Sequence, residues 1–194
     1  MLTTADGERY EGGFKRDQRH GYGTLESPDG SKYMGEWKLG EMHTESKTAK
    51  LVNADGSTYD GAFKDGARSG HGKMVYSGGD SYVGNWRGGK KHGVGIYAWA
   101  RGQNFKGKWQ DGKMHGNGTL AYPDGRVYEG GFMDNLPNGH GTLTARGNKI
   151  TGKWQDGVLA QRWVAREGQQ HLEAISGDGP DRVVLPLPAP ACEG

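Results

Sequence analysis

The feature that most limits how this chain can fold is a motif that returns at steps of 22 to 26 residues. Its opening residue is aromatic in six of seven places. Glycine stands two positions later and a second aromatic four positions later, both without exception. A fixed period of this length is typical of repeat proteins, in which each unit packs mainly on its neighbours. The opening positions are Tyr10, Tyr33, Tyr59, Tyr82, Phe105, Tyr128 and Ile150.

The spacing inside each repeat predicts a β-hairpin. In a strand, residues i, i+2 and i+4 lie on one face, so both aromatics and the glycine between them point the same way. Seven positions into each repeat stands Gly, Asp or Asn, which tolerates the positive φ of a tight turn. A G-x-G pair such as Gly93 and Gly95 follows on the return strand. Glycine inside a strand costs about 0.5–1 kcal/mol, so its recurrence predicts aromatic rings packed over bare backbone.

The pattern Y-x-G-x-[WF]-x-x-G-x-x-x-G-x-G resembles the MORN repeat, and the resemblance covers residues 7 to about 157. It implies an all-β fold, an elongated single-layer antiparallel sheet of consecutive β-hairpins. It also implies a scaffolding or membrane-associated role. Some members of the family carry a catalytic domain after the repeats, and we expect none here.

The chain divides into three parts by sequence pattern. Residues 1–157 form the array of seven repeats. Residues 158–176 form a short C-terminal cap, for which a helix is suggested although Gly168 weakens the pattern. Residues 177–194 are proline-rich and expected to be extended or disordered. The side chains that could line one face of the cap helix are Leu159, Trp163, Leu172 and Ile175.

The composition limits the class of protein and the cellular location that we expect. The net charge of +2, from 25 basic and 23 acidic residues, argues against a nucleic-acid binder. Cys192 is the single cysteine, which fits a reducing compartment. The first residues contain no apolar stretch of the signal-peptide kind, and no run approaches 18 apolar residues. We therefore expect a cytoplasmic location, with the cytoskeleton, a cilium or the membrane periphery as more specific sites.

Sequence motifs for catalysis or metal binding are missing. Two near-matches to a phosphate-binding loop, at 102–108 and 147–153, are followed by tryptophan where Ser or Thr belongs. The histidines recur in phase, so hairpins about 9.5 Å apart would hold them too far from one another to share a zinc ion. We predict no enzyme, no cofactor, no metal site and no small-molecule substrate.

Two sets of residues are candidate binding surfaces. The first is an aromatic column expected near one face of the sheet, where Trp and Tyr are common contact residues. The second is a basic segment from Trp86 to His115, where seven cations accompany one acid, Asp111. The column could instead be core, and the cations could be a solvated face. The aromatic set is Tyr76, Tyr97, Trp99 and Tyr122; the basic set is Arg87, Lys90, Lys91, Arg101, Lys106, Lys108 and Lys113.

The function expected from these features is that of a non-catalytic scaffold or adaptor, presenting an aromatic-lined sheet face to a peptide or helix of a protein partner. The cytoskeletal or ciliary setting comes from the family resemblance. The alternative is a peripheral module that binds anionic phospholipids through the basic set, because each cation near an anionic surface adds about 1 kcal/mol.

Overall fold

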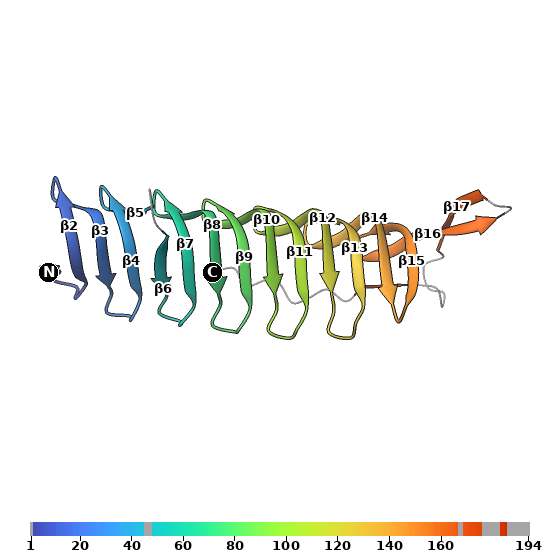
Figure 1. Cartoon of the computed structure of the whole chain (residues 1–194), viewed down its shortest axis with the longest axis horizontal. Coiled ribbons are helices and arrows are strands. Elements are labelled where there is room, and N and C mark those ends of the chain that lie inside the picture. The colour runs from blue at the N-terminus through green and yellow to red at the C-terminus, as the bar shows by residue number, and fades with distance from the viewer. Residues whose placement is uncertain (1, 45–47, 167–168, 176–182, 186–194) are drawn as a thin grey trace. The chain divides into compact units, whose positions relative to one another are not determined.

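The computed structural model describes residues 2–44, 48–166, 169–175 and 183–185. All regular structure in these ranges is β-strand, and the strands form an open antiparallel sheet of 17 strands in consecutive hairpins (Figure 1). The predicted all-β hairpin sheet is therefore confirmed. Contacts divide the chain into two compact units, Met1–Gly93 and Val94–Glu193.

The first unit contains nine complete strands. Each pairs antiparallel with its neighbour in the chain, except that β4 pairs with both β5 and β6. The strands are β1 (Leu2–Thr3), β2 (Arg9–Lys15), β3 (Gln18–Glu26), β4 (Lys32–Lys38), β5 (Glu41–His43), β6 (Ala49–Val52), β7 (Thr58–Lys64), β8 (Ala67–Val75) and β9 (Ser81–Arg87).

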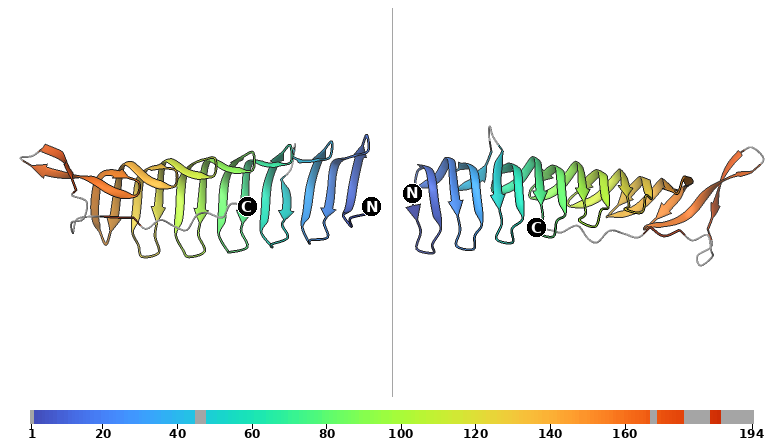
Figure 2. Two further views of the ribbon diagram at one scale, coloured as in Figure 1. Left: turned by 180° about the vertical axis from the view of Figure 1, so that it is seen from behind. Right: turned by 60° about the horizontal axis from the view of Figure 1, so that its bottom comes forward.

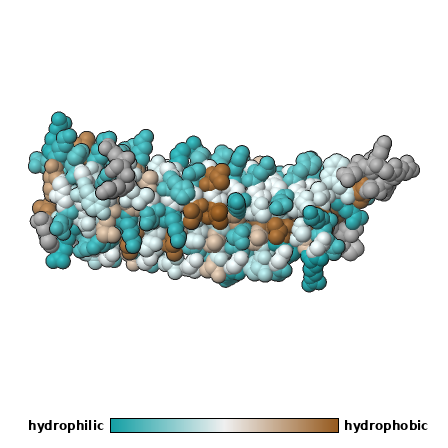
Figure 3. Space-filling model, viewed as in Figure 1, coloured by the Kyte–Doolittle hydropathy of each residue, from teal (hydrophilic) through white to brown (hydrophobic). Residues whose placement is uncertain are grey.

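The second unit continues the same pattern after β10 (Lys90–Ala98), which contains the boundary. The sheet from β11 to β17 is again paired antiparallel in chain order. Figure 2 shows these hairpins from two further sides, and Figure 3 shows the hydropathy of the molecular surface on the side drawn in Figure 1. The strands are β11 (Asn104–Gln110), β12 (Lys113–Ala121), β13 (Val127–Met133), β14 (Leu136–Ala145), β15 (Asn148–Gln155), β16 (Val158–Arg166) and β17 (Gln169–Ala174).

Four repeats, those that begin at Tyr10, Tyr59, Phe105 and Tyr128, are each held by an aromatic ring that lies over a pair of facing glycines. Gly61 of β7 is opposite Gly72 of β8, and the ring of Tyr59 covers both. The Tyr59 hydroxyl donates to the carbonyl oxygen of Ala62 at 3.0 Å. Tyr10, Tyr33, Tyr82 and Tyr128 make the same bond to the residue three positions on. The ring thus supplies the contact that glycine lacks, as the sequence predicted.

The rings of consecutive repeats stack edge to face. Tyr59 contacts Phe63 of its own repeat at 5.1 Å and Trp86 of the next repeat at 5.4 Å between centroids. In the second unit Tyr128 contacts Phe132 and Trp154 in the same way. Such pairs contribute about 0.5–1.5 kcal/mol each beyond burial. A continuous aromatic core therefore follows the inner face of each unit.

The C-terminal cap is a β-hairpin, so the prediction of a helix over residues 158–176 is wrong. β16 pairs with β15 from Val158 to Arg162 and with β17 from Gln161 to Arg166. A spacing of four residues suits a strand face as well as a helix face, so Leu159 and Trp163 did not distinguish the two. The unpaired edge of β15 favours the strand because it offers backbone donors and acceptors.

The turns between hairpins contain aspartates that accept backbone hydrogen bonds. The Ser31 N–H donates to Asp29 Oδ1 at 2.8 Å, and the Arg126 N–H donates to Asp124 Oδ1 at 3.1 Å. These bonds hold the pKa of both carboxyls below the ordinary value of 3.8. A carboxyl with a lowered folded pKa stabilises the fold above its unfolded pKa, and that contribution disappears as pH falls through the folded value.

We therefore expect the melting temperature to fall as pH drops from about 4 to about 2. The double variant Asp29→Asn/Asp124→Asn should lose less over that range, since an amide accepts the hydrogen bond but does not titrate. Thermal unfolding by circular dichroism at a series of pH values measures both. Equal acid dependence in the two proteins would contradict a role for these turns.

Candidate functional site

The four aromatic residues proposed as a partner-binding set are buried. Exposed fractions are 6% for Tyr76, 0% for Tyr97, 6% for Trp99 and 6% for Tyr122. Tyr97 and Trp99 contact each other at 4.6 Å, and burial raises the pKa of Tyr122 to about 12. The open apolar surface expected at these positions is absent, because the rings pack on neighbouring side chains of the sheet. Partner binding by them stays a prediction.

The basic set is distributed over both units. In the first unit Arg87 and Lys90 are exposed, but Lys91 is only 4% exposed and its Nζ lies 5.7 Å from the Tyr76 ring. Lys91 therefore differs from the expectation of a cation facing a lipid surface. Successive side chains of a strand point to opposite faces of the sheet. Because Lys90 faces outward, the Lys91 side chain lies on the aromatic face.

In the second unit Arg101, Lys106, Lys108 and Lys113 are exposed. Lys106 and Lys108 alternate with the buried Phe105 and Trp109 on β11, so they lie on the outer face. Lys113 is bonded to Asp134 at 3.1 Å, which offsets its charge. Lipid binding by this set stays a prediction.

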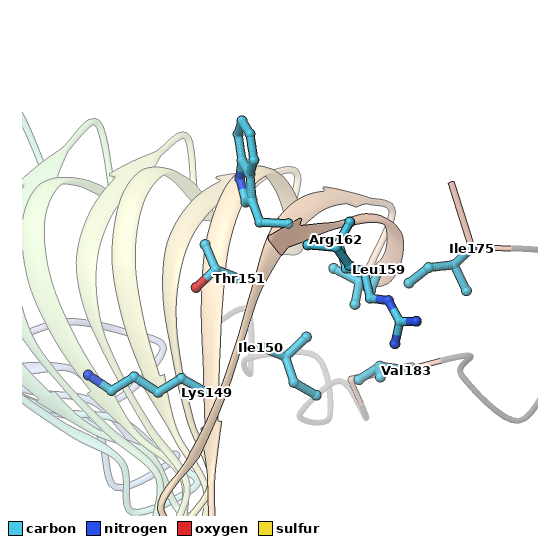
Figure 4. A pocket seen from close by; sticks show the side chains of 9 residues that line it. Lys149, Ile150, Thr151, Leu159, Arg162, Ile175 and Val183 are labelled. Atoms are coloured by element: carbon cyan, nitrogen blue, oxygen red, sulfur yellow. The ribbon is translucent and has the colours of Figure 1, made fainter. Parts of the chain in front are cut away.

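A groove at the C-terminal end of the second unit was not foreseen from the sequence. It has a volume of about 440 Å³ and lies between β15, β16 and the segment around Val183 (Figure 4). Six of its nine lining residues are apolar, and two are cations, Lys149 and Arg162. The lining residues are Lys149, Ile150, Thr151, Leu159, Arg162, Trp163, Val164, Ile175 and Val183.

The groove forms where the repeat pattern fails. Ile150 replaces the opening aromatic, and Gly152 is covered from the neighbouring strand instead: a Cβ on Gly152 would meet the Gln161 carbonyl oxygen and would lie 2.8 Å from Leu159 Cδ1. Gln161 and Trp163 replace the two glycines of the return strand. These departures were visible in the sequence, but they indicated only an end to the array.

A short segment of the tail pairs with the free part of β16 beside this groove. The Leu159 N–H donates to the Val183 carbonyl, and the Leu185 N–H donates to the Gly157 carbonyl, both at 3.0 Å. Val184 forms an antiparallel bridge with Val158. Leu185 is 2% exposed and Val184 is 49% exposed. The edge of β16 before β17 thus binds an extended peptide in this structure.

The groove is lined by two cations, one of which faces an acid on the next strand. Lys149 is exposed at the mouth, while Arg162 is half-buried and stands opposite Glu173 in the β16–β17 ladder. Figure 4 shows the Arg162 side chain directed toward Val183 and the Lys149 side chain directed away from the other labelled side chains. The arrangement offers backbone pairing, apolar side chains and positive charge.

Further chemistry is limited in the described part of the chain. No group of three His, Cys, Asp or Glu side chains there is placed to hold a metal ion. In the same ranges, no helix has the length and apolar character needed to cross a membrane.

The fold and the recurring ring-over-glycine unit define a repeat protein built on an open β-sheet. The MORN-repeat family model matches residues 10–32, 33–43, 59–81, 82–103, 105–125 and 128–148, and the chain belongs to that family. The family model matches six repeats, whereas seven were predicted from the sequence. The seventh, beginning at Ile150, is the degenerate repeat that lines the groove.

Two solved structures align with most of this chain but share little sequence with it. The Drosophila melanogaster SAS-4 (dCPAP) TCP domain, in complex with a proline-rich motif of Ana2 (dSTIL), is 11% identical, with a TM-score of 0.49 and coverage of 90% of this chain and 95% of that one. The Danio rerio CPAP TCP10 domain, in complex with a peptide of STIL, is 13% identical, with a TM-score of 0.38 and coverage of 92% and 84%. No curated protein matched the sequence.

Proposed function

We propose that this protein is a non-catalytic scaffold that binds a protein partner through an extended peptide segment at the C-terminal groove. MORN repeats support a protein-interaction scaffold in general terms. The observation that carries the specific proposal is the pairing of Val183–Leu185 with the edge of β16. The chain's own tail holds the place that a partner segment would take.

When a peptide adds a strand to a sheet edge, backbone hydrogen bonds provide the affinity and side-chain pockets provide the specificity. Backbone bonds at Gly157 and Leu159 would hold any extended segment, while alternate side chains select the sequence. One side chain would enter the buried position of Leu185, and the next would remain exposed like Val184. The exposed Lys149 favours an acidic residue nearby. The preferred segment is therefore apolar, extended and acidic at one end.

A peptide supplied in trans tests the site. Leu185→Pro in the full chain removes the N–H that donates to Gly157, which should loosen the chain's own segment. A fluorescent peptide of residues 180–187 should bind this variant at least about tenfold more tightly than it binds wild type, because the tethered tail competes at high effective concentration. Fluorescence anisotropy measures both dissociation constants.

Two matched controls make the result specific. The same peptide carrying Leu185→Pro should not bind, and Ile150→Asp in the chain should weaken binding of the unmodified peptide by about tenfold or more. Capture of partners from the protein's own cells should rise with Leu185→Pro and fall again when Ile150→Asp is added. Equal binding of the two peptides would refute strand addition at this edge.

The more specific expectations from the sequence remain proposals. A contact role for the Tyr76, Tyr97, Trp99 and Tyr122 rings would require them to leave their buried positions. The cytoskeletal or ciliary setting is supported by the family resemblance, and imaging of a tagged full chain tests it. The phospholipid alternative is tested by sedimentation with anionic vesicles at low and high salt, since exposed charges are screened within about 8 Å at physiological ionic strength.

A further inference from the structure

The outer edge of β2, in the first unit, is open over five residues. β2 pairs with β3 from Arg9 to Lys15. On its other side it pairs with β1 only at Arg9 and Tyr10. Within the residues that the structure describes, no strand pairs with Glu11–Lys15 on that side. An edge of this kind presents unpaired N–H and C=O groups and is a template for another strand.

Phe14 on this edge is the one incompletely covered member of its aromatic column in the first unit. It is 49% exposed, whereas Trp37, Phe63 and Trp86 at the same repeat position are 3–4% exposed. The Trp37 ring contacts tyrosine rings of two repeats, at 4.9 and 5.7 Å between centroids, whereas Tyr10, at 5.1 Å, is the one ring among the described residues that the Phe14 ring contacts. The stack of rings therefore ends in an exposed ring beside an open strand edge.

The sequence of the open edge is complementary to itself. When Glu11-Gly12-Gly13-Phe14-Lys15 is paired antiparallel with a second copy about Gly13, Glu11 faces Lys15 and Gly12 faces Phe14, each twice. Opposite charges that face each other across strands are favourable. Glu11 and Lys15 are the two charged residues of the segment. They face each other only when the pairing is centred on Gly13.

In this register Phe14 faces a glycine, as the corresponding aromatic residues do inside the array. At four places in the array the second aromatic of a repeat stands opposite a glycine of the preceding strand: Gly21 faces Trp37, Gly70 faces Trp86, Gly116 faces Phe132 and Gly139 faces Trp154. Pairing with a second copy would give Phe14 the same neighbour. A two-fold axis perpendicular to the sheet keeps the aromatic faces of both copies on one side.

We propose that two copies of this chain associate through the Glu11–Lys15 edges of β2, antiparallel and centred on Gly13, with Phe14 of each copy packed over Gly12 of the other. β1 occupies the edge beyond Glu11, so the ladder is limited to five residues. An interface this short forms a reversible dimer. The proposal concerns the first unit and is independent of the peptide groove in the second.

Sedimentation equilibrium of the full chain from roughly 1 to 200 µM tests the association. Wild type should shift from monomer to dimer across this range. Phe14→Ser should weaken dimerisation by about tenfold or more, because each dimer loses two rings. Tyr22→Ser is the matched control: Tyr22 is 60% exposed, lies on β3, and should leave the equilibrium unchanged.

A charge swap separates this register from other modes of association. Glu11→Lys and Lys15→Glu should each weaken the dimer by about tenfold through two like-charge pairs, while the double variant should return to within about threefold of wild type. Both side chains are exposed, so folding should not be affected.

Cross-linking gives a second, geometric readout. In a Cys192→Ser background, the pair Glu11→Cys/Lys15→Cys should form dimers under mild oxidation, since the two positions face each other across the axis. Glu11→Cys alone should not, because its two copies would lie about 13 Å apart along the strands. A chain that stays monomeric at 200 µM, or a dimer unaffected by Phe14→Ser and the single charge changes, would overturn the proposal.

Discussion

Replacing Gly61 with alanine should lower the free energy of unfolding by about 3 kcal/mol. The added Cβ would lie 2.5 Å from Tyr59 Oη and 2.6 Å from Gly72 Cα, closer than atoms can approach. The Tyr59 ring cannot move aside, because it is stacked against Phe63 and Trp86 and its hydroxyl is bonded to the backbone. The Gly72 Cα belongs to the neighbouring strand, so relief requires the strands to separate.

Urea unfolding followed by tryptophan fluorescence measures this loss. Gly78→Ala is the matched control, since an added Cβ there meets no heavy atom within 4 Å. That substitution should change stability by less than about 0.5 kcal/mol. If both variants unfold at the same urea concentration, the tight packing of tyrosine over facing glycines does not stabilise the sheet as we argue.

The second large effect is expected at Trp99. Trp99→Ala should destabilise the protein by about 3–5 kcal/mol, because the ring is 6% exposed and packs on Tyr97. Trp163→Ala, the same substitution at a ring that is 38% exposed, should cost less than about 1 kcal/mol. Thermal and urea unfolding compare the two.

This comparison also decides the role of the aromatic set. A Trp99→Ala protein that keeps its stability but loses a partner would support the contact role predicted from the sequence. A Trp99→Ala protein with a much lower melting temperature would place the ring in the core and leave the groove beside Ile150 as the proposed binding site. The peptide titration with the Leu185→Pro chain then tests that groove separately.

Much of the fold could be predicted because the sequence patterns that specify it are local and recur in every repeat. The alternation of Tyr59, Gly61 and Phe63 specifies one face of a strand, and Gly66 permits the positive φ that the turn requires. Each of these spacings covers only a few residues and recurs in seven repeats, so one irregular repeat does not hide the pattern. The second repeat illustrates this, since its return strand is split into β5 and β6 yet both halves still pair with β4.

The candidate binding site was less predictable because burial depends on what lies beyond the repeat. The sequence placed Trp99 in a recurring aromatic column and Lys91 in a basic segment, but it could not say whether other side chains cover them. It likewise identified the changes at Ile150 and Trp163 without indicating what would fill the space they leave. The groove exists only because β16 pairs with β17 along one half and with Val183–Leu185 along the other.

By itself, then, the sequence determined the hairpin, the ring over its glycines, the turn positions and the membership of a repeat family. Tertiary structure alone decided that the cap is a hairpin, that the aromatic set is covered, and that the tail returns to the edge of β16. The physical reason is the range of the interactions. Strand alternation and turn geometry are fixed within a few residues, whereas edge pairing joins Leu159 to Val183 across a stretch of chain whose sequence carries no periodic signal.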